Sequence, residues 1–318
     1  CSSMKFGIES GSQTMLDIME KKFVVNDIKK AIFSSIEIGL ASPLQGFMVG
    51  MPGETLKTAK ESGQLLGELA AKLRVPLKLI YNNDGIFYCI PLVGTPMYEY
   101  GKQLGLIGQT VDEEEKYLEL TSNIAQHKRY YINFNGAPMS EVVFWDILIF
   151  LEATRTYVKL MKGKSEDENL KKKYENQLSV QGLNPQTKSK ERQVAIMGGS
   201  GLAKDTTFSQ YFITNFLREN IVFNKIVARL PRVLVYPIVR YALYFEYLIQ
   251  KHFLKDDHNL HRETNAKVRP EIRIKDDLVD PSKTTQKDRS LRTIVAKRMA
   301  EFERSEQEKT LSQLTGGP

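Results

Sequence analysis

Residues 46–55 read Gly46-Phe47-Met48-Val49-Gly50-Met51-Pro52-Gly53-Glu54-Thr55, a strand that breaks at a turn and continues into a helix. Pro52-Gly53 predicts the turn, and the helix is expected to run from Glu54 or Thr55 to about Leu73. Glycines 46 and 50 remove two side chains from one face of the strand, which gives room for a flat ligand such as a nucleobase. The stretch lacks the Gly-Lys-Ser/Thr of a P-loop and the glycine spacing of a dinucleotide fingerprint.

The same alternation of strand and helix recurs on both sides of this stretch. We expect a strand over Lys5–Glu9 that ends in Ser10-Gly11-Ser12, and a helix over Asp27–Gly39 capped by Asn26. Leu44–Gly50 is the next strand, and Leu77–Tyr81 with Gly85–Ile90 forms a third strand region. Short apolar runs that alternate with amphipathic stretches are typical of parallel β-α units.

After Val111 the pattern becomes helical. Helices are expected over Val111–Tyr130 and Ser140–Met161, followed by a highly charged stretch over Lys162–Lys190. We therefore predict four regions, which are β/α units over 1–108, a helical extension over 109–190, an amphipathic helical region over 191–255 and a polar, partly disordered tail over 256–318.

Composition narrows the class of protein. With 318 residues, 42% of them hydrophobic and 26% charged, the chain is neither wholly disordered nor fibrous. Cys1 and Cys89 can supply neither a disulfide framework nor a four-cysteine metal site, so a reducing compartment is expected. Because the chain opens on Cys1 inside an apolar pattern, we interpret it as a piece truncated upstream.

Charge is divided unevenly. Residues 1–150 hold 14 Lys and Arg against 17 Asp and Glu, whereas residues 151–318 hold 31 against 21. Residues 221–253 combine basic and aromatic side chains, and basic residues interrupt their apolar pattern too often for a membrane span. Our preferred interpretation is an amphipathic helix pair that covers the core, and the alternative is peripheral contact of 221–255 with an anionic membrane.

The end of the first strand offers polar ligands. Glu9 can accept hydrogen bonds from ribose hydroxyls or an ammonium group, and Gly11 lets the backbone approach closely. The alternative is a capped turn in which Ser12 satisfies helix N–H groups.

Three segments in this order resemble the second half of the radical S-adenosylmethionine (SAM) core, in the group whose members often carry an upstream cobalamin-binding domain. They are Phe6-Gly7-Ile8-Glu9-Ser10-Gly11-Ser12, residues 46–55 as quoted above, and Pro91-Leu92-Val93-Gly94-Thr95-Pro96-Met97-Tyr98 with Gly105-Leu106-Ile107. The resemblance covers about a third of the chain and ends near Gly108.

The resemblance implies an α/β fold, namely the last three strands of a partial (β/α)6 TIM-like barrel followed by a mostly helical extension. It implies SAM bound across the strand ends, with Glu9, Ser10 and Gly11 near the ribose or methionine portion. Gly46, Gly50 and Met48 would lie against the adenine, and the strand of Phe87 and Tyr88 would close that pocket. The family also implies a [4Fe-4S] cluster, an electron donor such as a flavodoxin or ferredoxin, a small-molecule substrate and a cytoplasmic location, with nucleic acid disfavoured as a partner.

The chain departs from the family at the cluster, which needs three closely spaced cysteines. Neither Cys1 nor Cys89 has such neighbours. We expect the ligands upstream, so the parent protein would be the enzyme and this chain alone inactive. Any cobalamin domain would also lie upstream.

Two alternatives stay open. One is an enzyme resembling the tRNA methylthiotransferases, which share the Ser-Gly-Ser and Pro-Gly-Glu-Thr elements. The helical pattern after Gly108 disfavours it, because a terminal RNA-binding barrel needs short strands. The other is a barrel remnant without a cluster whose basic C-terminal half binds membrane or nucleic acid.

Overall fold

The computed structural model describes most of the chain up to residue 180 and several later segments. The described residues are 6–40, 44–80, 86–103, 106–108, 110–121, 132, 134–135, 137–180, 216–217, 220–253, 285–290, 292–293, 296–297, 300–301, 303–304 and 307–308.

A parallel sheet lies at the centre of the described N-terminal part. Its strands are β1 (Phe6–Glu9), β2 (Leu44–Val49) and β3 (Ile86–Tyr88), in the order β1-β2-β3. Helices α1 (Gln13–Ile18) and α2 (Val25–Glu37) lie between β1 and β2 in the chain, and α3 (Leu56–Leu73) and α4 (Leu77–Ile80) lie between β2 and β3. The α/β class with parallel strands is confirmed, and the described residues form no closed barrel.

Two local predictions were wrong. Leu77–Ile80 is the single helical turn α4 instead of a strand, because Pro76 favours the first turn of a helix and its carbonyl accepts from the Leu79 N–H at 2.9 Å. Asn26 lies inside the first turn of α2, whose N-cap is Val24. Asp27 supplies the carboxylate that accepts from the Val24 N–H at 3.0 Å.

Helix α8 (Met139–Leu160) is the centre of the helical part, close to the span expected from the sequence. It packs directly on α3, whose Gly63 and Gly67 face its backbone. A Cβ at Gly63 would lie 2.4 Å from the Ile149 carbonyl oxygen, and one at Gly67 would lie 2.3 Å from that of Ala153. The two helices are therefore in backbone contact. The chain's one tryptophan, Trp145, is buried on α8.

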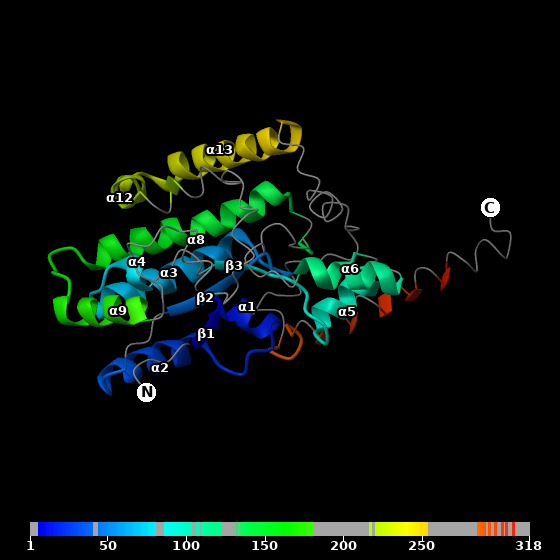
Figure 1. Ribbon diagram of the computed structural model, residues 1–318, viewed down its shortest axis with the longest axis horizontal. Coiled ribbons are helices and arrows are strands. Elements are labelled where there is room, and N and C mark those ends of the chain that lie inside the picture. Colours follow the sequence, from blue (N-terminus) through cyan, green and yellow to red (C-terminus); the bar gives the residue numbers. More distant parts are fainter. Residues whose placement is uncertain are drawn as a thin grey trace.

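The remaining helices lie outside this pair, on one side of it or beyond its ends, as Figure 1 shows. They are α5 (Pro96–Gln103), α6 (Val111–Thr121), α9 (Glu168–Val180), α12 (Ile221–Arg229) and α13 (Arg232–Phe253). Helices α12 and α13 form a layer on the side of α8 that is turned away from the sheet (Figure 1). Among the described residues no helix is both long enough and apolar enough to cross a bilayer.

Two ion pairs of the described residues join α13 to α8, Arg240 with Glu141 and Arg232 with Glu152. The buried Glu152 of α8 accepts from Arg232 Nε at 3.0 Å and from Arg232 Nη2 at 2.8 Å, and also from the Tyr236 hydroxyl. Burial raises the pKa of Glu152, but the hydrogen bonds from Arg232 and Tyr236 outweigh it and leave the pKa below its ordinary value. Glu152 is thus held as a carboxylate.

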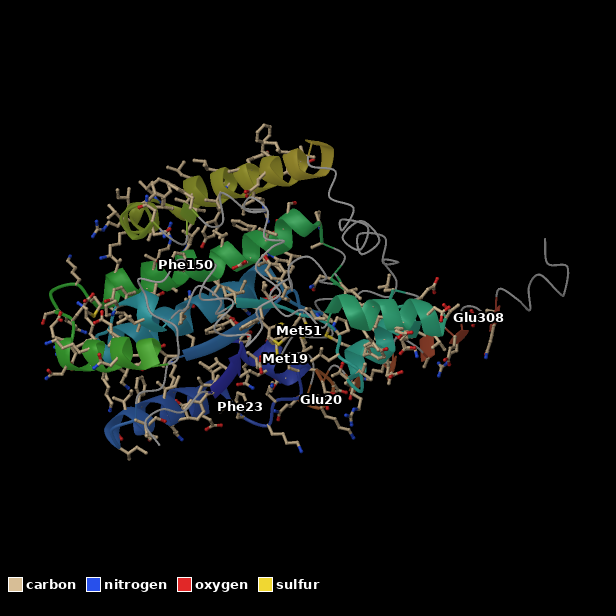
Figure 2. The ribbon with its side chains drawn as sticks, viewed as in Figure 1. Met19, Glu20, Phe23, Met51, Phe150 and Glu308 are labelled. Carbon is tan, nitrogen blue, oxygen red and sulfur yellow. The ribbon has the colours of Figure 1, made fainter. Side chains whose placement is uncertain are left out.

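Part of the polar C-terminal tail returns to the N-terminal helices. Arg289 donates to Asp17 of α1 at 3.0 and 2.7 Å, and both side chains are buried. The backbone N–H of Arg292 donates to Glu20 at 3.1 Å, and Figure 2 shows Glu20 beside this returning segment. Residues 285–290 are therefore packed against the fold.

Candidate functional site

The carboxyl ends of the three parallel strands meet at one edge of the sheet, where α/β proteins bind ligands. Figure 2 shows Met51, just past the end of β2, on the side from which α5 and α6 extend, whereas Phe150 lies on α8. The Cys89 N–H donates to the Val49 carbonyl at 3.1 Å, which joins the ends of β2 and β3.

Glu9 ends β1 in a left-handed conformation, with φ of 62°. That conformation is uncommon for a residue other than glycine, and such backbone strain gathers at functional sites. The Glu9 carboxylate lies on the face of Gly7 and pairs with Lys21 at 3.0 Å. Both side chains of this pair are partly exposed, so a ligand could reach the carboxylate.

Ser10 and Gly11, which were predicted to contact the ligand, lie against α3. The Ser10 hydroxyl lies 3.0 Å from that of Ser62, which also accepts from the Gly11 N–H at 2.9 Å. A Cβ on Gly11 would lie 2.6 Å from Ser62 Cα, so the close approach that Gly11 permits is to this helix. Ser12 makes no capping hydrogen bond, although it is the N-cap of α1.

Strands β2 and β3 place their side chains on two faces. Phe47 and Val49 of β2 are buried, opposite Ile86 and Tyr88 of β3 in register. The other face carries Gly46, Met48 and Phe87, which are only half-buried, with Met48 opposite Phe87. Gly46 and Met48 therefore share the open face that the alternation of the sequence predicts.

Tyr88, a predicted ligand contact, points to the opposite face. Its hydroxyl donates at 3.0 Å to Asp146 on α8, and both groups are buried. Phe87 is the residue of β3 that lies beside Met48. Whether Tyr88 takes part in binding stays a prediction. Phe87, from the same strand β3, is added to the candidate site because it lies beside Met48.

Sequence reasoning missed a buried acid at the turn after β2. Glu54 is 5% exposed, and its carboxyl oxygen accepts a hydrogen bond from the Gly50 N–H at 2.5 Å. Gly50 has a left-handed backbone conformation, with φ of 84°. Burial raises the pKa of Glu54 to about 8; the backbone N–H groups of Gly50 and Met51 oppose the rise, and the charge of Asp146 adds to it. At neutral pH this carboxyl group holds its proton.

Asn135 closes the same turn from outside. Its side-chain amide donates to the Gly50 carbonyl at 3.0 Å and to the Met51 carbonyl at 2.7 Å. The only advance signal for the Glu54 site was the Pro-Gly-Glu sequence at a strand end. Nothing local to Asn135 indicates that it meets this turn, at least 84 residues away along the chain. Nothing local to Asp146 indicates that its charge acts on Glu54.

Cys89 follows β3 as a buried thiol within 3.3 Å of the Met97 sulfur. Burial raises the pKa of Cys89. The charge of Glu54, which ionises at a lower pH than the thiol, and the charge of Glu9 raise it further. Because the thiol is protonated and enclosed, it does not fit the role of a cluster ligand. Cys1 lies outside the described residues, and in the described part no three His, Cys, Asp or Glu side chains gather as metal ligands.

Comparison with protein-family models, with curated proteins and with solved structures finds no match to this chain.

Proposed function

We propose that this chain supplies the SAM-binding half of a radical SAM enzyme, with its three strands as the last three of a partial (β/α)6 barrel. The observation that carries the proposal is the half-buried face of strands β2 and β3, formed by Gly46, Met48 and Phe87. Glu9 stands nearby at the end of β1, where its partner in register is Phe47. Parallel strands are normally covered on both faces, and here the second face is only half-covered. The proposal assigns further strands and a ligand to that face.

The residues of this face fit the chemistry of an adenosyl ligand. Gly46 leaves space against the sheet, and the Met48 and Phe87 side chains offer apolar contact to an adenine ring. The partly exposed Glu9 carboxylate can accept hydrogen bonds from ribose hydroxyls or from an ammonium group, which would replace Lys21 as its partner. In the family, bound SAM supplies the radical chemistry, and this chain's part would be to bind and orient it.

The described residues do not fit a [4Fe-4S] cluster, so no step through a cluster is assigned to them. The family resemblance assigns any cobalamin to an upstream domain. The proposal leaves both groups to parts of a parent enzyme outside the described residues.

The helical C-terminal part favours this proposal over a tRNA methylthiotransferase. After Gly108 the described residues form helices α6, α8, α9, α12 and α13 and contribute no strand. A terminal RNA-binding β-barrel would need several short strands there.

The proposal is tested by labelling the methionine methyl groups with carbon-13 and titrating the protein with SAM or S-adenosylhomocysteine. We expect the Met48 methyl signal, assigned through Met48→Leu, to shift saturably with both ligands. Gly46→Val should abolish the shift because its side chain fills the space left for adenine. Gly46 suits this test better than Gly50, whose left-handed backbone would strain any substitute.

The matched pair Glu9→Gln and Glu37→Gln separates binding from general charge effects. Glu37 is exposed on α2. Glu9→Gln should weaken binding about tenfold, the order of magnitude for one charge-assisted hydrogen bond, whereas Glu37→Gln should change nothing. A Met48 signal that stays fixed at millimolar ligand, or that shifts equally in Gly46→Val, would contradict the proposal.

A further inference from the structure

The outer surface of α12 and α13 is apolar although nothing among the described residues covers it. On α13 the buried residues Val235, Val239, Leu243 and Glu246 follow helical spacing and face inward. The opposite side exposes a second set of large apolar side chains, namely Val233, Leu234, Ile238, Tyr241, Tyr244 and Phe245. Val233, Tyr241 and Phe245 are 79%, 74% and 63% exposed.

Helix α12 continues this surface. Val222 and Ile226 are exposed on it, and Leu230 is exposed directly after it. Two residues of chain join α12 to α13. We call the exposed apolar residues of these two helices the outer face. Contiguous apolar surfaces of this kind mark sites of interaction with a protein or a membrane, whereas single exposed apolar residues do not.

The charges around the outer face have one sign. Residues 221–253 contain five Lys or Arg and one acid, Glu246, which is buried on the inner side of α13. Lys225 and Arg229 are exposed, and neither pairs with a carboxylate of the described residues. Arg232 and Arg240 bind Glu152 and Glu141 of α8, yet each side chain is about half exposed at the border of the outer face.

From this arrangement we propose that the outer face of α12 and α13 binds the surface of an anionic lipid bilayer, with both helices lying in the plane of the interface. Exposed Tyr and Phe beside Lys and Arg are the residues that interfacial helices place at the level of the headgroups. The layer of α12 and α13 lies at the edge of the molecule, where it could meet a flat surface (Figure 1).

Charge and apolarity together select this partner. A nucleic acid would use the basic residues but leave the exposed Val, Ile and Phe side chains without an apolar partner. A second copy of the chain would satisfy the apolar side chains, but it would bring together two surfaces that each carry exposed Lys and Arg, and like charges disfavour that contact. An anionic bilayer satisfies both sets at once.

The test is co-sedimentation of the protein with vesicles of phosphatidylcholine alone or of phosphatidylcholine with phosphatidylglycerol. We expect binding to the anionic vesicles, and weaker binding at 0.5 M ionic strength, where the Debye length falls below about 5 Å. Lys225→Gln with Arg229→Gln should weaken partitioning about 30-fold, since each basic residue near such a surface contributes roughly fivefold. Tyr241→Ser with Phe245→Ser should weaken it by at least about tenfold.

Matched controls lie on the other side of the molecule. Lys22→Gln with Lys30→Gln removes two exposed charges at α2, and Ile38→Ser removes an exposed apolar side chain there. Neither control should change partitioning. Far-UV circular dichroism and thermal unfolding in the absence of lipid should match the parent chain for every variant, because each substituted residue is exposed.

Three outcomes would overturn the proposal. The first is the absence of vesicle binding at low salt. The second is binding that the charge variant loses and the Tyr241/Phe245 variant keeps, which indicates electrostatic adsorption of the kind that nucleic acids also support. The third is a dimer in sedimentation velocity without lipid that the Tyr241/Phe245 variant dissociates, which assigns the outer face to a second copy.

Discussion

Glu54 is a carboxyl group held away from water at the turn after β2, and its proton links folding to pH. Below about pH 4.5 the group is protonated in both the folded and the unfolded chain. Between about pH 4.5 and 8 the unfolded chain loses the proton while the folded chain keeps it. Stability contributed by this group therefore falls as pH rises, by at most roughly 1.4 kcal/mol per pH unit.

Glu54→Gln should remove this dependence, since an amide oxygen can still accept from the Gly50 N–H and carries no proton to lose. We expect the urea midpoint of the variant to change less between pH 5 and pH 8 than that of the parent chain. Glu37→Gln, at an exposed position, serves as the control and should follow the parent. Parallel curves for Glu54→Gln and the parent would show that another group carries the pH dependence.

For single residues, the sequence predicted which face of a strand a side chain occupies, because that follows from local alternation. It did not predict contacts between residues that are distant in the chain. The shared face of Gly46 and Met48 follows from the two-residue period of a strand. The same period places the Tyr88 side chain on the other face, where its hydroxyl donates to Asp146. Asp146 lies within an apolar helix, and its hydrogen-bond partner Tyr88 is 58 residues away along the chain. The local sequence therefore could not indicate this contact.

At the level of elements, the contact between α3 and α8 depends on two glycines. Gly63→Ala and Gly67→Ala would each place a Cβ within 2.4 Å of a backbone carbonyl of α8, which cannot turn aside as a side chain can. Alanine favours an isolated helix by about 1 kcal/mol, but here overpacking should outweigh that gain and cost about 2 kcal/mol net.

Urea denaturation of each glycine variant measures this cost. Gln64→Ala is the matched control, because Gln64 lies on the same helix between the two glycines and is exposed. It should stay within about 0.5 kcal/mol of the parent chain. If Gly63→Ala were as stable as Gln64→Ala, the helices would have to lie farther apart than the structure places them.

The attachment of α13 to α8 should depend on Arg232. Arg232→Met leaves the buried Glu152 carboxylate with fewer donors and should cost about 2 kcal/mol, less than a fully buried pair because Arg232 is half exposed. The pKa of Glu152 is lowered in the fold, so its contribution is present above about pH 4.5 and is lost as pH falls through the folded value. The variant's stability should therefore fall less on acidification.

Arg229→Ala is the control for this prediction, since Arg229 is exposed and pairs with no described carboxylate. Chemical denaturation at pH 7 and pH 4 compares the two variants. An Arg232→Met protein with the stability of Arg229→Ala at both pH values would show that the pair contributes nothing to folding.

The positions of elements were largely readable from the sequence because each prediction used local periodicity. The strand at β2 and helices α3 and α8 were expected near their observed bounds. The backbone contact of α3 and α8 was missed, because a Gly-x-x-x-Gly pair within a helix indicates a close approach without naming the partner.

Across the whole molecule, the C-terminal segment is tied to α1 by one buried ion pair. Arg289→Ala would leave the Asp17 carboxylate buried without its guanidinium and should cost about 3 kcal/mol. Arg292→Ala, whose side chain is 74% exposed, should cost under about 1 kcal/mol. Amide hydrogen exchange at residues 285–290 should accelerate in the first variant and stay unchanged in the second.

The sequence of the tail gives no signal for this contact. Its polar composition lacks the apolar residues that predict a packed core, so partial disorder was expected over 256–318. The segment 285–290 is held instead by a charge that finds its partner 272 residues away. Composition indicates how much apolar surface a segment can bury. It does not indicate whether one charged side chain of the segment pairs with a distant residue.

The placement of Trp145 gives the molecule a built-in optical probe. As the chain's one tryptophan it accounts for nearly all of the intrinsic emission excited at long ultraviolet wavelengths. Its indole is buried on α8, and its Nε1–H has no hydrogen-bond partner among the residues that the structure describes, so the native emission should be blue-shifted. A red shift would report that water has reached the layer around α8, whereas melting confined to α5 and α6 would leave the spectrum unchanged.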